Sequence, residues 1–309
     1  MTDRDSGRRL PGLACASVLA SISGVSYAQT LNSESVCSQD NQPGFHACAV
    51  SAGTSAATHV TAGGNPDFSG YWRRRTWAFE NFEEHSANAD DFGGTSVVVD
   101  PPSGVVPIQP WAEAKRLEIR EQFVHHNAAC FLSGPAGTMY MTSRFQFLQD
   151  DETLAMVGEQ LTAHPYRVIP LDGREHIGNL SLWNGDPLGH WEGDSLVIES
   201  AHQNGIYMLD QQGRFITDEA QIVERMTLID NNTIHYEATF DDPNVYTQPF
   251  TISFAFRRDT DANPEIWEEA CYETNTDSMQ LFRNNGLRIF PGISGVEARQ
   301  LKAAWESKQ

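Results

Sequence analysis

Hydrophobic and polar residues alternate with a period of two along most of the second half of the chain. This spacing is typical of half-buried strands, and short turn signals such as Asp172-Gly173 separate the alternating segments. The alternation predicts strands at residues 139–149, 153–160, 166–171, 195–200, 221–230, 233–240, 250–258 and 265–273. Because the connections are mostly of hairpin length, we expect a mainly β fold: an antiparallel meander of about eight strands closing into a barrel. A barrel of that size has room for one small ligand.

Two segments outside this pattern have the period of a helix. Pro110 opens the first at the position where proline is favoured, and the second runs over residues 296–308 near the end of the chain. We therefore expect two helices flanking the barrel. Their predicted apolar stripes are Trp111, Ala114, Leu117 and Val124 in the first, and Leu301, Ala304 and Trp305 in the second.

The first 28 residues have the three parts of a cleavable signal peptide. Arg4, Arg8 and Arg9 supply the positive region, residues 10–25 the apolar region, and the segment ending at Ala28 the cleavage site. Arg8-Arg9 as a twin-arginine signal and Cys15 as a lipoprotein cysteine remain alternatives. The apolar region is too short and interrupted to span a bilayer. The sequence thus predicts a periplasmic or secreted protein without a membrane span.

The cysteines indicate how the mature chain is cross-linked. Of 5 cysteines, four remain after cleavage, an even number in an oxidising compartment. Of the three possible pairings we favour Cys37–Cys48, which are close in sequence, and Cys130–Cys271, which would cross-link the main domain across a long loop. Metal thiolates are the alternative, but the chain has no C-x-x-C spacing. Residues 29–64, rich in small and polar residues, are expected to be a flexible arm, and residues 65–309 a single barrel domain.

The charge balance narrows the choice of partners. With 21 Lys+Arg against 41 Asp+Glu, the formal net charge is −20. Such a charge repels nucleic acid and anionic membranes. A small-molecule substrate or ligand is the expected partner, and the oligomeric state stays open.

The densest polar cluster lies between residues 172 and 194, among glycines. A histidine beside a carboxylate can move protons at neutral pH, and an arginine can stabilise a developing oxyanion. Turn chemistry is the alternative, since Asp172-Gly173 is a hairpin signal by itself. The catalytic candidates are Asp172, Arg174, His176, His190, Glu192 and Asp194, and the aromatic candidates for contact with a ligand are Trp183 and Trp191.

The predicted strands add a second group of candidates. Glu224 falls on the same strand face as apolar neighbours, so it either lines the lumen or is paired. Glu159 and Arg167 lie on adjacent predicted strands and could pair with each other, and Arg225 could pair with Glu237 or Glu269. We name Glu159, Arg167 and Glu224 as substrate-binding candidates, with structural ion pairs as the alternative.

Several familiar chemistries have no motif in this chain. There is no G-x-S-x-G elbow, P-loop, dinucleotide fingerprint or H-E-x-x-H. His125 and His126 are adjacent, so a helix cannot direct both at one ion. A metal held by His176, His190 and a carboxylate stays an alternative, but we predict neither a metal nor another cofactor.

Short motifs are spread over residues 66–275. They are PDFSGYW at 66–72, Arg167, DGREH at 172–176, GHWEGDSLV at 189–197, Glu224-Arg225, DDP at 241–243 with Tyr246, and EACYE at 269–273. With these motifs the chain resembles a large family of exported bacterial proteins, mostly of unknown function. The resemblance implies export and a shared site but no particular reaction. The chain departs from the family pattern at 130–137, where the family usually has Cys-x-Pro-x-Gly-x-Pro-Arg.

Three functions fit these observations. The first is a cofactor-independent acid–base enzyme (lyase, isomerase, hydratase or cyclase) in a calycin- or lipocalin-like barrel, acting on a small apolar oxygen-bearing molecule such as an aromatic or terpenoid. In it His176 would be the base or acid, oriented by Asp172 or Glu192, and Arg174 would hold the oxyanion. The alternatives are a periplasmic carrier or sensor without turnover and a carbohydrate-binding module with exposed tryptophans.

Overall fold

The structure is a computed structural model, and it describes residues 35–53, 59–87, 93–159, 165–178, 180–267 and 271–309. The predicted signal peptide, residues 1–28, lies outside the described residues. All the strands and helices given below lie within them.

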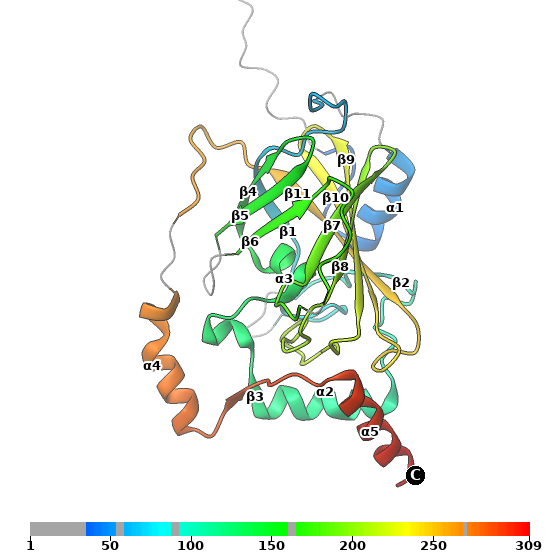
Figure 1. Cartoon of the computed structure of the whole chain (residues 1–309), viewed down its shortest axis with the longest axis vertical. Coiled ribbons are helices and arrows are strands. Elements are labelled where there is room, and N and C mark those ends of the chain that lie inside the picture. Colours follow the sequence, from blue (N-terminus) through cyan, green and yellow to red (C-terminus); the bar gives the residue numbers. More distant parts are fainter. Residues whose placement is uncertain (1–34, 54–58, 88–92, 160–164, 179, 268–270) are drawn as a thin grey trace, which may run out of the picture. The chain divides into compact units, whose positions relative to one another are not determined.

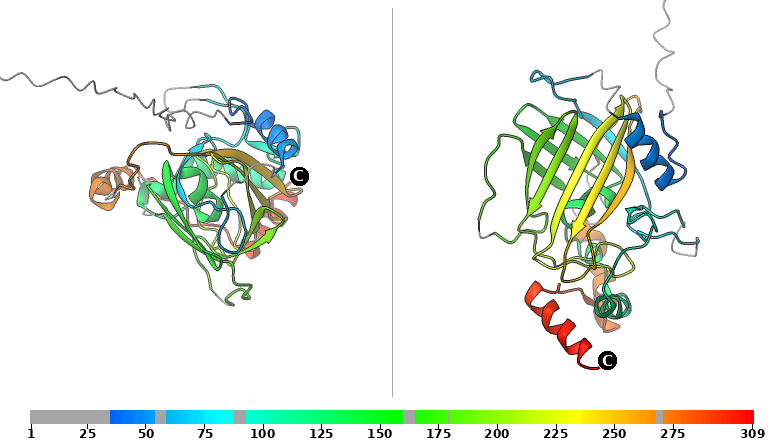
Figure 2. Two further views of the ribbon diagram at one scale, coloured as in Figure 1. Left: turned by 90° about the horizontal axis from the view of Figure 1, so that it is seen from above. Right: turned by 90° about the vertical axis from the view of Figure 1, so that its right-hand side faces the viewer.

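A large antiparallel sheet curls into a nearly closed barrel (Figure 1; Figure 2, left). Its strand order is β6-β5-β4-β1-β11-β10-β9-β8-β7, with β2 pairing with β11 beside this path, and β6 and β7 lie next to each other. The strands are β1 (Gly70–Arg75), β2 (Val98–Asp100), β4 (Arg144–Gln149), β5 (Thr153–Gly158), β6 (Tyr166–Pro170), β7 (Asp186–Glu192), β8 (Ser195–Ala201), β9 (Gln221–Asp230), β10 (Thr233–Asp241) and β11 (Phe250–Arg258). The predicted mainly β barrel is confirmed.

Six of the predicted strands coincide with β5, β6, β8, β9, β10 and β11. The alternation succeeds there because one strand face fills the barrel: on β10, Ile234, Tyr236 and Ala238 are buried in the core. The interior is rich in aromatic rings, and Phe145, for example, packs edge-on against Phe256 with ring centroids 4.9 Å apart.

Two predicted strands are wrong in part or whole. Residues 139–149 split into the end of helix α3 (Gly134–Met141) and strand β4, because α3 is buried on every side and so has no amphipathic period. In the predicted strand 265–273, the described residues 265–267 and 271–273 form no strand, and helix α4 (Cys271–Asn284) begins at Cys271.

Strands β1, β2 and β7 were not predicted. Pro187 and Gly189 make β7 resemble a loop in the sequence. A Cβ atom at Gly189 would lie 2.4 Å from a methyl carbon of Leu171, so a larger residue there would need the Leu171 side chain to move.

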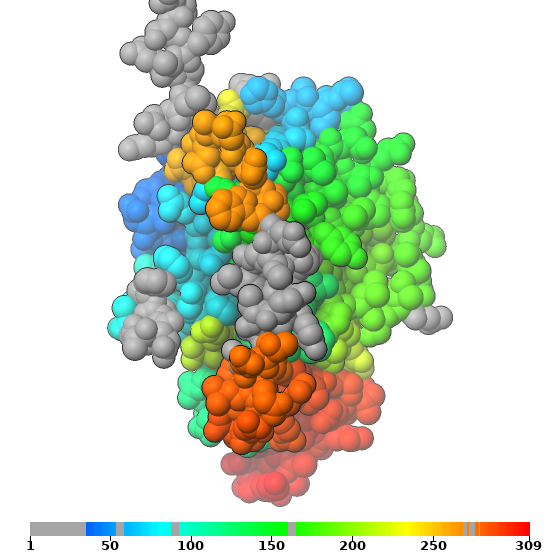
Figure 3. Space-filling model, turned by 90° about the vertical axis from the view of Figure 1, so that its left-hand side faces the viewer, coloured from blue at the N-terminus to red at the C-terminus, as the bar shows by residue number. Residues whose placement is uncertain are grey.

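Both predicted flanking helices are present, as α2 (Pro110–Gln122) and α5 (Gly295–Glu306), and they pack together. The stripe predicted for α2 is mostly wrong: Trp111, Ala112 and Ile119 are its buried residues. On α5, Leu301 and Trp305 pack against the core, whereas Ala304 is exposed. A short parallel pair, β3 (Phe123–Val124) with β12 (Arg288–Ile289), lies beside them. In Figure 3, α4 is orange and α5 red. No helix in the described part of the chain is long and apolar enough to cross a membrane.

Both favoured disulfides are present. Cys37–Cys48 closes a short loop, and Cys130–Cys271 links the 3-10 helix η1 (His126–Ala129) to α4 across 141 residues. The predicted flexible arm differs from the structure, because residues 42–52 form helix α1 (Gln42–Ala52). Phe45 of α1 is fully buried against Ile229 and Ala255 on the outside of the barrel (Figure 2, right).

Candidate functional site

The catalytic candidates of the 172–176 loop do not form the arrangement expected of them. Asp172 accepts hydrogen bonds from the Arg174 guanidinium, at 2.7 Å from Nη2, and both side chains are exposed. That bond is the main reason why the pKa of Asp172 is lowered. His176 instead contacts Asp186, with 3.0 Å between Nδ1 and Oδ2, and the Ile177 amide donates to the same oxygen at 2.7 Å. The carboxylate beside His176 is therefore Asp186, not Asp172 or Glu192.

The second set of catalytic candidates lies on the hairpin of β7 and β8. His190 and Glu192 lie on the same side of β7, with 3.5 Å between His190 Nε2 and Glu192 Oε1. Both side chains are about half exposed. Glu192 also pairs with Arg225 of β9, and this hydrogen bond is the main cause of its lowered pKa. Arg225 thus forms its ion pair with Glu192. It also lies opposite Glu237 of β10, as expected, and its charge favours the ionised form of that carboxyl. Glu269, the other expected partner, lies outside the described residues. Asp194 is exposed in the hairpin turn.

The two candidate tryptophans pack against different aromatic partners. Trp183 stacks on Phe131, with ring centroids 5.1 Å apart, and Trp191 stacks on Phe68 at 5.9 Å. Both tryptophans are half-buried.

Arg167 and Glu224 form a pair inside the barrel. The guanidinium donates two hydrogen bonds to the carboxylate, at 2.8 and 2.6 Å, and both side chains are fully buried. The Tyr236 hydroxyl donates a third, at 2.7 Å. The prediction that Glu224 lines the lumen or is paired is confirmed in both respects. The predicted pairing of Arg167 with Glu159 is wrong, since Glu159 lies near Arg144 and accepts from the Trp267 amide at 2.9 Å.

Buried polar atoms lie close to this pair. Arg167 Nε, the Tyr207 hydroxyl and His126 Nε2 have no hydrogen-bond partner among the described residues. The rings of His126 and Tyr207 are 6.0 Å apart. Burial lowers the pKa of His126 well below its usual range and raises that of Tyr207, so both are uncharged at neutral pH. Of the candidates in the 172–194 cluster, Trp183 reaches this buried group, with its ring centroid 6.2 Å from that of His126.

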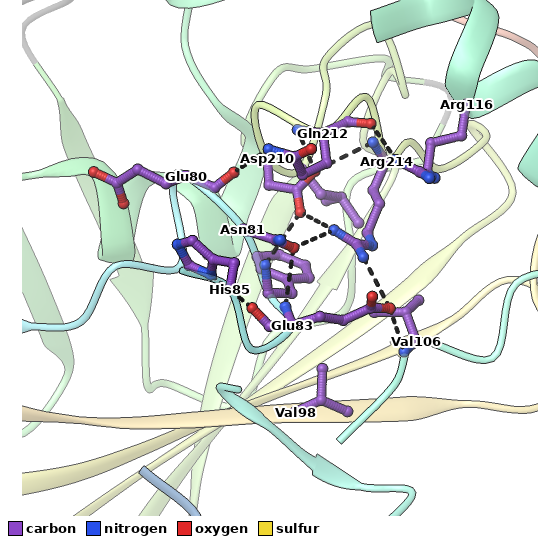
Figure 4. Close-up of polar contacts among 12 residues, drawn as sticks. Glu80, Asn81, Glu83, His85, Val98, Val106, Arg116, Asp210, Gln212 and Arg214 are labelled. Atoms are coloured by element: carbon purple, nitrogen blue, oxygen red, sulfur yellow. Dashed lines mark hydrogen bonds and ion pairs between the residues drawn. The ribbon is translucent and has the colours of Figure 1, made fainter. Parts of the chain in front are cut away.

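A buried ion network that the sequence reasoning missed lies beside α2 (Figure 4). Arg214 contacts Asp210 at 2.5 Å, Glu83 at 2.8 Å and Asn81 at 2.8 Å, and its side chain is almost fully buried. Arg116 of α2 donates to the Gln212 carbonyl at 2.7 Å. The charged groups are matched within the protein, which indicates that the network joins loops to α2 rather than binding a ligand.

A cleft of about 780 Å³ lies beside β1 and the end of β11. Arg73 and Arg257 face each other across the two strands, and Arg73 also lies opposite Arg144 of β4. Asp259 and Asp261 neutralise Arg73 and Arg144 at 2.6–2.9 Å. The other residues that line the cleft include Arg74, Arg75 and Arg258, with Trp77, Thr76, Thr95 and Ser143.

The sequence analysis did not predict this cleft, although two runs of arginine in the sequence point to it. Three consecutive arginines begin at Arg73 and two begin at Arg257, in a chain with net charge −20. The two runs of arginine are far apart in the sequence, and the pairing of β1 with β11 brings them together. Among the described residues, no carboxylate within ion-pair distance is found for Arg75 or Arg257.

A scan against protein-family models finds no match, and a search of curated proteins finds none either.

Proposed function

We propose that this chain is an exported small-molecule-binding protein without turnover, and that its arginine-lined cleft holds an anionic ligand. The observation that carries this proposal is the cleft itself, where five arginines gather in a strongly acidic chain. Its volume of about 780 Å³ is within the usual range for small-molecule sites, roughly 300–1,000 Å³.

The chemistry of the cleft favours a carboxylate, sulfate or phosphate group. A guanidinium donates two parallel hydrogen bonds to such groups, and Arg75 and Arg257 have no carboxylate partner among the described residues. Arg257 lies opposite Arg73, whose charge is already matched by Asp259 and Asp261, so a bound anion would supply a counter-charge for Arg257. Trp77, 44% exposed, offers an aromatic surface to the apolar part of the ligand.

The export part of the proposal rests on the signal-like start and on two disulfides. Disulfides persist in oxidising compartments such as the periplasm or the outside of the cell.

Matched pairs of ligands test the proposal. Phenyl phosphate, phenyl sulfate and benzoate would be compared with phenol and benzamide by calorimetry on the signal-free protein. We expect the charged member of each pair to bind and the neutral member not to bind. Arg257→Gln or Arg75→Gln should weaken the affinity for the charged ligand about tenfold, since each removes a charge-assisted hydrogen bond. Arg283→Gln, an exposed arginine of α4, is the control and should bind normally. Equal binding of charged and neutral ligands, or of all variants, would show that the cleft is not the site.

The acid–base enzyme is a second candidate, favoured by the contact of His176 with Asp186. A carboxylate at 3.0 Å from Nδ1 can orient a histidine for proton transfer at its other nitrogen. Incubation with phenolic and terpenoid alcohols, followed by mass spectrometry, would reveal turnover that His176→Gln abolishes. Product formation by both proteins would remove His176 from the mechanism. The carbohydrate-binding module is the third candidate. Trp72 is fully buried and cannot contribute to its surface, whereas Trp77 is 44% exposed.

A further inference from the structure

Two histidines and a glutamate meet on the outside of the barrel, where α1 covers β10. His235 and Glu237 are two residues apart on β10, so both point away from the barrel interior, and His46 reaches them from α1. His46 Nδ1 lies 3.1 Å from His235 Nε2 and 3.7 Å from Glu237 Oε1. One ligand atom from each residue lies within 4.8 Å of the other two.

We propose that His46, His235 and Glu237 bind a divalent transition-metal ion such as Zn²⁺. Two imidazoles and one carboxylate are a common protein ligand set for zinc, with the fourth position left for water or another ligand. With bonds of about 2.0–2.2 Å, neighbouring ligands of a tetrahedral ion are about 3.4 Å apart. The separations of 3.1 and 3.7 Å are close to that value.

The protonation states suit an ion. Burial lowers the pKa of His46, and burial together with the nearby His46 lowers that of His235 to about 3. Both rings are therefore neutral at pH 7, and a neutral ring is the form that binds metal. Burial raises the pKa of Glu237, and Arg225 opposes that shift. A cation beside the carboxylate would favour its ionised form in the same way.

The surrounding structure holds the three residues in place. Next to His46, Phe45 is fully buried, and the Cys37–Cys48 disulfide links α1 to the segment before it. His46 and Glu237 remain 24% and 21% exposed, which leaves the ion a path from solvent. In this arrangement the ion would take the place of the hydrogen bond between the two rings, and each neutral ring would carry its proton on its other nitrogen. The Ser253 hydroxyl, 2.9 Å from His235 Nε2, would give up its contact with that nitrogen.

The negative charge of the whole chain acts in the same direction. A net charge of −20 raises the local concentration of cations around the protein. The site is separate from the arginine-lined cleft and shares no residue with it. Its occupation would fasten α1 to the barrel, independently of any ligand in the cleft.

Calorimetric titration of the chelator-treated, signal-free protein with Zn²⁺ alone tests the proposal. We expect one equivalent to bind and the melting temperature to rise with Zn²⁺, because the ion binds only the folded chain. His46→Gln and Glu237→Gln should each weaken binding by at least about tenfold, which is the loss expected even when a partner of a ligand is removed. Mg²⁺ should not compete, since it prefers oxygen ligands.

The control is His59→Gln, which removes an exposed histidine outside the proposed site. It should bind Zn²⁺ like the parent protein. Absence of stoichiometric Zn²⁺ binding would overturn the proposal, as would an equal loss in His59→Gln and His46→Gln. Circular dichroism of each variant separates loss of the site from loss of the fold, and Co²⁺ absorption provides a second readout of histidine coordination.

Discussion

Arg167 and Glu224 show how much one pair of residues depends on its surroundings. They belong to β6 and β9, which are not neighbours in the sheet, and they are fully buried. Removing a charge from water is costly, and the pair is tolerated because two hydrogen bonds and the Tyr236 hydroxyl satisfy the carboxylate. This makes the pair a sensitive point for stability.

Breaking that pair should be strongly destabilising. We expect Arg167→Met to lower the free energy of unfolding by about 3–5 kcal/mol, because it leaves the Glu224 carboxylate buried without its cation. Urea denaturation measures this loss. The double variant Arg167→Met/Glu224→Leu should recover much of it. A double variant no more stable than the single one would contradict this explanation.

A buried histidine should make the stability depend on pH. Burial lowers the pKa of His125 to about 3, from 6.5. As the pH falls below 6.5 the unfolded chain takes up a proton that the folded chain refuses until about pH 3. The free energy of unfolding should therefore fall with pH over this window, by up to about 1.4 kcal/mol per pH unit for this residue. His125→Gln should have a shallower slope in urea titrations at pH 4–6.5, whereas a parallel slope would contradict the assignment.

At the scale of elements, two helices are attached to their neighbours by disulfides. Cys37–Cys48 spans 11 residues before and within α1, and Cys130–Cys271 spans 141 residues to the start of α4. In the chain-entropy account, a cross-link that closes a longer loop restricts the unfolded chain more.

The two disulfides should therefore differ in their effect on stability. We expect Cys130→Ser/Cys271→Ser to cost about 4–5 kcal/mol and Cys37→Ser/Cys48→Ser about 2–3 kcal/mol. Thermal unfolding of the two double variants measures the difference. If the short loop proved the more important one, contacts of α1 with the barrel rather than loop entropy would dominate.

At the scale of the whole molecule, a positive cleft lies within a strongly negative chain. Salt screens the attraction between exposed charges, with a Debye length of about 10 Å at 0.1 M. The affinity of the cleft for an anionic ligand should thus fall several-fold between 50 and 500 mM NaCl, as measured by calorimetry. The affinity for an uncharged analogue should stay the same, and a common salt dependence would contradict an electrostatic origin.

The start of the mature chain can be tested at the same scale. If residues 1–28 are a cleaved signal, the protein recovered from the periplasm of an expressing bacterium should begin at Gln29. Intact-mass spectrometry distinguishes this product from one that begins at a lipid-modified Cys15. An uncleaved cytoplasmic chain would contradict export altogether.

The sequence by itself determined the elements whose pattern is local. The alternation located six barrel strands and placed Glu224 on the lumen side of β9, and the helical period located α2 and α5. It failed where the local pattern is ambiguous, as in the all-buried α3 and in β7 with Pro187 and Gly189. The cysteine pairing also followed from the sequence, because few combinations exist.

Only the tertiary structure decided which distant residues meet. His46 and His235 are 189 residues apart, and Arg73 and Arg257 meet only because β1 pairs with β11. Likewise, Arg167 faces Glu224 because the sheet curls until strands that are not neighbours lie opposite each other. Local periodicity shows which face of a strand is buried, but the partner across the barrel depends on register and closure. Those depend on the packing of the whole chain.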